Sequence, residues 1–129
     1  MDPKHLAALV PSGKSETDKA HALVALGFPI VEPVLPQIIR WMQDLNWPVA
    51  GVFLPFLVSI GAPMAPHVRS VLATNDDCWK YALLEAVVRQ SPELAAALAS
   101  ELTRLAHNPT AGEQAEGVAQ AAQDILRSV

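Results

Sequence analysis

Apolar residues recur every three or four positions along most of this chain, which is the spacing of one face of a helix. Glycines, prolines and Asn/Asp clusters separate these runs, and no segment has the alternating pattern of a convincing strand. The pattern therefore predicts seven helices. They are expected at residues 17–26, 33–44, 47–60, about 63 onward, 78–90, 92–106 and 110–127.

A repeat is visible within this pattern. The segment at residues 32–47, EPVLPQIIRWMQDLNW, returns in weaker form at residues 62–79, with Pro33 and Pro36 aligned on Pro63 and Pro66. The first N–H groups of a helix have no intrahelical partner, so prolines at its first and fourth positions are compatible with a helix. A spacing of roughly 30 residues between similar helical units is typical of helical repeat proteins.

We therefore predict an all-α fold, specifically a short HEAT- or armadillo-like right-handed superhelix of about seven helices. It is expected to form a single domain over residues 1–129, in which residues 1–15 are irregular. The segment 47–60 is apolar nearly all round and is expected to be the most buried helix, with Asn46 as its N-cap. Thr110 and Glu113 have the spacing of a capping box.

Composition narrows the class of protein. Hydrophobic residues make up 51% of the chain and the formal net charge is −4, with no basic stripe, so nucleic acid is not an expected partner. The single Cys78 excludes an internal disulfide and fits a reducing compartment. The apolar run at 49–60 is shorter than the ~20 residues a bilayer requires, and the N-terminal run is too short for a signal peptide. We expect a cytoplasmic protein without membrane contact.

Three stretches carry a resemblance to a known family. Residues 41–50 read WMQDLNWPVA, residues 76–81 read DDCWKY, and residues 108–110 read NPT. With these stretches the chain resembles, over nearly its whole length, a bacterial family known as domain of unknown function number five-zero-seven-one. The resemblance implies a HEAT-like helical fold and brings no assigned reaction.

The first two of these stretches supply the candidate binding residues. Stacked repeats would bring Trp47 and Trp79 to one rim with Asp44 and Asp77 beside them, a surface suited to a basic or Arg-rich peptide. The full set of candidates is Asp44, Asn46, Trp47, Asp76, Asp77, Trp79, Lys80 and Tyr81. The alternative is structural: Asp77 caps a helix, Lys80 pairs with it locally, and Trp47 wedges between repeats. Trp41 falls on the apolar stripe and is expected in the core.

Other chemistry finds little support in the sequence. The four histidines are dispersed, so neither a metal site nor a cofactor is expected. Cys78 lies in the first turn of a helix, but Asp76 and Asp77 would raise its pKa, so a packed thiol is the better interpretation. No catalytic residue is assigned, and glycine-rich phosphate loops are absent from the sequence.

Three hypotheses follow. The first is a non-catalytic module that binds an unidentified protein or peptide, for which a basic segment is the candidate. The second is an inhibitor or immunity-type protein that neutralises a toxin or enzyme, for which an acidic surface would be suited. The third is a small-molecule binder or enzyme that uses a groove between helices. A monomer or weak dimer is expected, because the ends of a helical array need polar caps.

Overall fold

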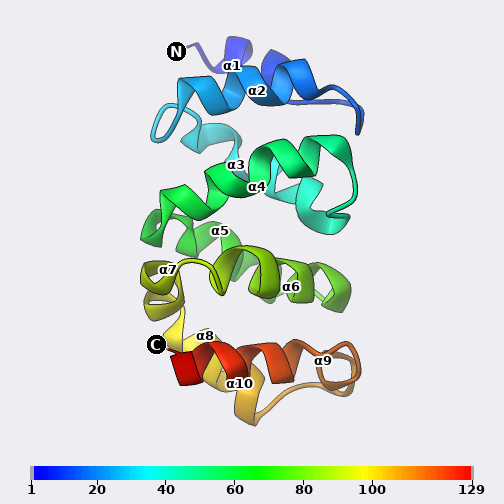
Figure 1. Ribbon diagram of the computed structural model, residues 1–129, viewed down its shortest axis with the longest axis vertical. Helices are drawn as coiled ribbons and strands as arrows, with labels where there is room; N and C mark the ends of the chain where they lie inside the picture. Colours follow the sequence, from blue (N-terminus) through cyan, green and yellow to red (C-terminus); the bar gives the residue numbers. More distant parts are fainter. Residues whose placement is uncertain (1, 129) are drawn as a thin grey trace. The chain divides into compact units, whose positions relative to one another are not determined.

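The computed structural model describes residues 2–128, and every regular element in that range is helical (Figure 1). The all-α prediction is confirmed. The chain divides into two compact units, Met1–Leu57 and Val58–Val129. The prediction of one domain over 1–129 stays a prediction, and its end residues, 1 and 129, lie outside the described range. Within that range, no single helix is long and apolar enough to span a membrane.

The first unit contains most of the elements that the sequence predicted for it, with one addition. The elements are α1 (Pro3–Leu9), α2 (Thr17–Leu26), the 3-10 turn η1 (Glu32–Val34), α3 (Leu35–Arg40), the 3-10 turn η2 (Trp41–Gln43) and the main part of α4 (Pro48–Ile60). The prediction that residues 1–15 are irregular is wrong for α1. The Asp2 side chain accepts the Lys4 N–H, Pro3 occupies the first turn, and Leu6 is buried.

The proline repeat is the clearest link between sequence and local structure. In each copy a 3-10 turn with a proline at its start leads into an α-helix that again has a proline at its start. Pro33 and Pro36 do this in η1 and α3, and Pro63 and Pro66 do it in η3 (Ala62–Met64) and α5 (Ala65–Leu72). The expectation that these prolines lie where no backbone N–H is needed is confirmed.

The second unit continues from α5 through α6 (Asp77–Leu83), the π-helical turn η4 (Leu84–Val88), α7 (Pro92–Ala97), α8 (Ala99–His107), α9 (Ala111–Ala115) and α10 (Val118–Ser128). The helices predicted at 92–106 and 110–127 are each divided in two. The first breaks at Leu98, and the second breaks at Gly117, which has a φ of 85°. These breaks and α1 raise the number of α-helical segments in residues 2–128 to ten, so the predicted number of seven is not confirmed.

The core of the second unit lies chiefly between α8 and α10, which pack side by side (Figure 1). Both helices bury one face and leave the other polar, as their sequence pattern predicts. The buried residues are Leu102, Leu105 and Ala106 on α8 and Val118, Ala119, Ala121, Ala122 and Ile125 on α10.

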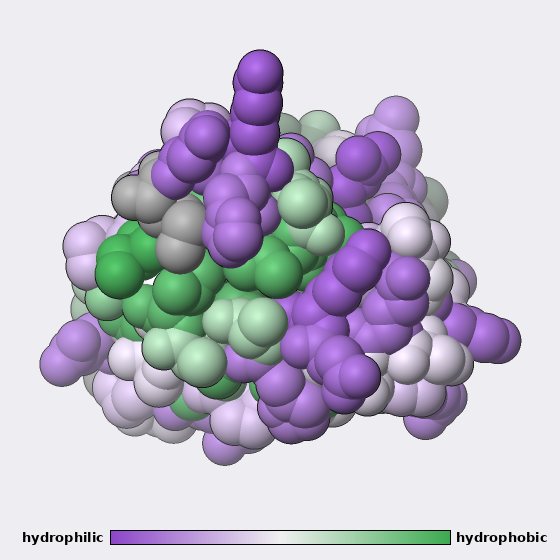
Figure 2. Space-filling view, turned by 90° about the horizontal axis from the view of Figure 1, so that it is seen from above, coloured by the Kyte–Doolittle hydropathy of each residue, from purple (hydrophilic) through white to green (hydrophobic). Residues whose placement is uncertain are grey.

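In the first unit, the prediction that 47–60 forms the most buried helix is wrong. Only Val49, Ala50, Phe53 and Leu57 of α4 are buried, and the rest of the helix is half-buried or exposed. Apolar exposure also occurs on α1 and α2, where Leu9, Val24 and Leu26 are half-buried. Figure 2 views the molecule from the side of these two helices and shows apolar surface gathered there among polar side chains.

The break between α9 and α10 requires a glycine at position 117. Its φ of 85° lies in the left-handed region, and an added Cβ would come within 3.3 Å of the Tyr81 ring. We expect Gly117→Ala to lower the free energy of unfolding by about 1–3 kcal/mol, measured by urea denaturation. Gly51→Ala is the matched control. Gly51 lies in α4 with open space around it, and alanine should stabilise the helix by about 0.5–1 kcal/mol. Equal effects at both sites would contradict the strain assigned to Gly117.

Candidate functional site

Lys80 lies inside a charged cluster rather than on the surface. It is only 3% exposed, and its Nζ lies 3.0 Å from Oδ1 of Asp77 and 2.9 Å from Oε2 of Glu113. Burial tends to lower the pKa of the Lys80 ammonium, but its bonds to Glu113 and Asp77 outweigh this and raise the pKa. The cation is therefore fixed between two carboxylates.

Glu113 is the centre of this cluster and is fully buried. Its Oε1 and Oε2 accept bonds from the two terminal nitrogens of Arg104, and Oε1 also accepts the Thr110 N–H at 2.8 Å. The Glu113 N–H in turn donates to the Thr110 hydroxyl at 3.1 Å, so the predicted capping box is confirmed. The Arg104 guanidinium is the main cause that lowers the pKa of Glu113 to about 2.

This geometry favours the structural interpretation of Lys80 and Asp77. Lys80 pairs locally with Asp77, as that alternative proposed, and it gains a second partner from 33 residues further along the chain. Neither charge is free to meet a partner. Replacing Lys80 would therefore disturb the fold, so this residue cannot test binding.

The remaining candidates of this stretch surround the start of α6. Asp76, rather than Asp77, is the N-cap, and its Oδ1 accepts the Trp79 N–H at 3.1 Å. Trp79 is half-buried, and Tyr81 is 41% exposed beside Gly117. Asp76 and Tyr81 are thus the candidates here that remain on the surface.

Cys78 is exposed, so the prediction of a packed thiol is wrong. Its Sγ donates to Oε2 of Glu116 at 3.4 Å. This contact is the largest cause that raises the pKa of the thiol, and Asp76 and Asp77 contribute in the predicted direction. A raised pKa disfavours the thiolate that a nucleophile requires.

The other candidate stretch lies in the first unit, between α3 and α4. Oδ1 of Asp44 accepts the Asn46 N–H at 2.9 Å and so closes a tight turn. The Trp47 carbonyl accepts the first N–H groups of α4, from Ala50 and Gly51. Trp47 therefore occupies the N-cap position, and the assignment of Asn46 as N-cap is wrong.

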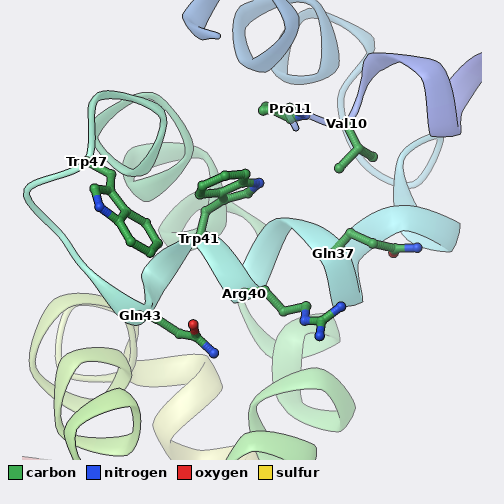
Figure 3. A pocket seen from close by; sticks show the side chains of 7 residues that line it. All are labelled: Val10, Pro11, Gln37, Arg40, Trp41, Gln43 and Trp47. Carbon is green, nitrogen blue, oxygen red and sulfur yellow. The ribbon is translucent and has the colours of Figure 1, made fainter. Parts of the chain in front are cut away.

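Trp47 and Trp41 form the wall of a hollow in this unit. Their ring centroids are 5.4 Å apart and their planes are inclined by 76°, an edge-to-face arrangement. Both indoles are half-buried, so the expectation that Trp41 belongs to the core is wrong. The hollow has a volume of about 310 Å³ and is lined by Val10, Pro11, Gln37, Arg40, Trp41, Gln43 and Trp47 (Figure 3).

The polar side of the hollow was not found from the sequence. Figure 3 shows Val10 and Pro11 on one side of it and Arg40 and Gln43 on the other. Arg40 is exposed, and within residues 2–128 its side chain has neither an ion pair nor a hydrogen bond. It is also the sole charged residue of the lining. The signal available in the sequence was the three-residue spacing of Gln37, Arg40 and Gln43, which places polar groups on one helix face.

The family described as Domain of unknown function (DUF5071) matches residues 9–126. The chain belongs to the DUF5071 family. No curated protein matches it.

The DUF5071 match includes both candidate stretches and every residue that lines the hollow. It also includes all four members of the charged cluster, Asp77, Lys80, Arg104 and Glu113. Within residues 2–128 of this DUF5071 protein, no group of three or more His, Cys, Asp or Glu side chains is arranged to hold a metal ion. The described residues thus form an ion-paired internal cluster around Glu113. They also form an open hollow walled by Trp41 and Trp47, beside the unpaired Arg40.

Proposed function

We propose that this DUF5071 protein is a non-catalytic protein-binding module and that its Trp41–Trp47 hollow holds the partner. The observation that carries the proposal is the combination of two half-buried indoles with the unpaired Arg40 around one opening. Trp and Arg, together with Tyr, are the residue types enriched among binding hot spots. Residues needed only for packing would be more fully buried, as Phe53 is.

The open shape of the hollow supports a protein partner over a small substrate. Ligand pockets have volumes of about 300–1,000 Å³ and enclose most of their ligand. At about 310 Å³ and open to solvent, this hollow suits one or two side chains that project from a larger partner. A partner side chain that packs against the exposed surfaces of the two indoles would remove both rings from water, which is where hot-spot energy arises.

We also infer that the two proline-led segments are units of a short, right-handed HEAT- or armadillo-like superhelix. The support is their shared local structure, a 3-10 turn followed by an α-helix with a proline at each start. An experimental structure in which the two segments pack as a closed bundle would contradict this arrangement.

The binding proposal is tested with two variants that each replace an aromatic side chain by alanine. Trp47→Ala is expected to weaken capture of the partner by about 30-fold or more, the effect of losing a hot spot of about 2 kcal/mol. Tyr81→Ala removes an exposed aromatic side chain outside the hollow and should leave capture unchanged. Proteins retained by immobilised wild type and each variant would be identified by mass spectrometry. The partner would then be purified and titrated calorimetrically.

Two controls make the result decisive. Circular dichroism and urea denaturation must show that Trp47→Ala remains folded, since Trp47 is also the N-cap residue of α4. If Tyr81→Ala failed to capture the partner while Trp47→Ala still captured it, the binding site would lie at residues 76–81. Equal capture by all three proteins would contradict a role for the hollow.

A further inference from the structure

We propose that the Trp41–Trp47 hollow recognises an extended acidic peptide segment, in which a carboxylate stands next to a proline or aliphatic side chain. This inference rests on the proposed function and names the chemistry of the partner. It differs from the basic partner that the sequence predicted. Three properties of the hollow support it: its indole walls, its cation and its side-chain amides.

The indole walls select a compact apolar side chain. Because the rings of Trp41 and Trp47 are inclined by 76°, the face of one and the edge of the other are presented to the same space. Val10 and Pro11 extend the apolar wall (Figure 3). Aromatic-lined grooves of this kind bind proline-containing segments, whose extended conformation costs little entropy to fix.

The charge of the hollow selects an anion. Arg40 is exposed and unpaired within residues 2–128, whereas four other arginines each pair with a carboxylate. A guanidinium can bind a carboxylate through two parallel hydrogen bonds. On a chain of net charge −4, this isolated positive site favours an acidic segment and disfavours a basic one.

The two carboxylates expected to attract a basic partner, Asp44 and Asp77, lie outside the lining of the hollow. Oδ1 of Asp44 accepts the Asn46 N–H, and Asp44 is not part of the lining. Asp77, in the second unit, is paired with Lys80. Neither carboxylate lines the hollow, so the hollow itself offers a basic peptide no negative charge.

The side-chain amides suit a peptide main chain. Gln37 and Gln43 are both exposed, and each amide offers donors and an acceptor. The N–H and C=O groups of an extended segment are unpaired and can meet such amides without a preformed strand. The hollow thus offers a site for one apolar side chain of the partner, a site for one carboxylate, and amides that can contact the main chain between them.

The experiment is a titration of the full, ¹⁵N-labelled chain with short blocked peptides, monitored by NMR. The chain has three tryptophans, so its three indole N–H signals report the hollow through Trp41 and Trp47 and a third site through Trp79. The probes are acetyl-Ala-Pro-Leu-Glu-Ala-amide and its counterparts with Gln or Lys in place of Glu. A thymidine trinucleotide is the fourth probe, because nucleobases also stack on indoles.

We expect the Glu peptide to shift the Trp41 and Trp47 signals and to leave Trp79 unchanged. It should bind about threefold to tenfold more tightly than the Gln peptide, with the Lys peptide the weakest. Arg40→Gln should remove the preference for Glu over Gln. Arg127→Gln is the matched control and should keep it, since Arg127 lies on α10 outside the lining. The preference should also decline as salt is added.

Several results would overturn the inference. If the wild type bound the Glu and Gln peptides equally, the hollow would have no site for a carboxylate. If it bound the Lys peptide more tightly, the partner would be basic, as the sequence predicted. The inference would also be rejected if only the Trp79 signal responded, or if no signal responded at ~10 mM peptide. Tighter binding of the trinucleotide than of the Glu peptide would reject it as well. If partner capture still depends on Trp47 in those cases, the proposed function stands without this ligand class. If neither the peptide preference nor the dependence of partner capture on Trp47 were observed, both the ligand class and the proposed function would be rejected.

Discussion

Replacing Glu113 by alanine is expected to lower the free energy of unfolding by about 3–5 kcal/mol, the usual cost of breaking a buried ion pair. Glu113 is fully buried, and its removal leaves the Lys80 ammonium, itself 3% exposed, with Asp77 as its remaining ionic partner. The same change removes the carboxylate that caps the Thr110 N–H. Urea denaturation at pH 7 would measure the loss.

Glu116→Gln provides the control for this prediction. Glu116 is exposed, lies three residues from Glu113 and is hydrogen-bonded by Cys78. Its replacement should change the free energy of unfolding by less than about 0.5 kcal/mol. A loss of similar size in both variants would show that the cluster around Lys80 is not the source of the stability.

Acid is expected to weaken the fold through the same carboxyl group. The pKa of Glu113 is lowered from 4.5 to about 2, chiefly by its bonds to Arg104, so Glu113 binds a proton less readily in the folded chain than in the unfolded chain. Its contribution, about 3 kcal/mol, is fully present above the unfolded pKa and is lost as pH falls through the folded value. Unfolding free energies measured between pH 6 and pH 2 should decline over this range.

The Glu113→Gln variant isolates the contribution of this one group, since other carboxylates also titrate there. The pKa values of Glu101 and Asp124 are lowered too, by bonds to Arg69 and to Gln120 respectively, and both remain in the variant. The variant should therefore be less stable than wild type at pH 6 and approach it near pH 2. Curves that stay parallel across the range would contradict the assignment to Glu113.

Local signals in the sequence identified the helix starts well. The proline pairs, the end of α2 at Leu26 and the Thr110–Glu113 capping box were all predicted correctly, because each depends on residues within one turn. The signal for α1 was equally local, an Asp followed by a proline at its start. It was missed because the glycine and prolines nearby suggested an irregular segment.

Breaks inside long apolar patterns could not be predicted in the same way. The leucines of α7 and α8 keep their helical spacing through Leu98, where the backbone leaves the helical conformation at a buried residue. The helical spacing of apolar residues indicates which residues face the core, but it does not indicate where one helix ends and the next begins. Gly117 was the one available signal for the second break, since it supplies a positive φ.

The candidate site was predicted only in part, because burial and long-range pairing are not local properties. Lys80 beside Asp77 has the pattern of a solvated surface pair, and only the fold brings Glu113 to it from another helix. Conversely, Trp41 follows the core spacing but remains half-buried at the end of α3. Trp47 was named as a candidate from the sequence and lines the hollow, whereas Arg40 was not named, because its place beside the hollow depends on the fold.

The four prolines that begin η1, α3, η3 and α5 also act on the chain before it folds. Pro33, Pro36, Pro63 and Pro66 are all exposed, so burial explains little of their value. Each proline fixes its own φ and restricts the residue before it, which reduces the number of conformations open to the unfolded chain. Part of the stability of these helix starts therefore originates in the denatured state, where no contact of the folded protein would reveal it.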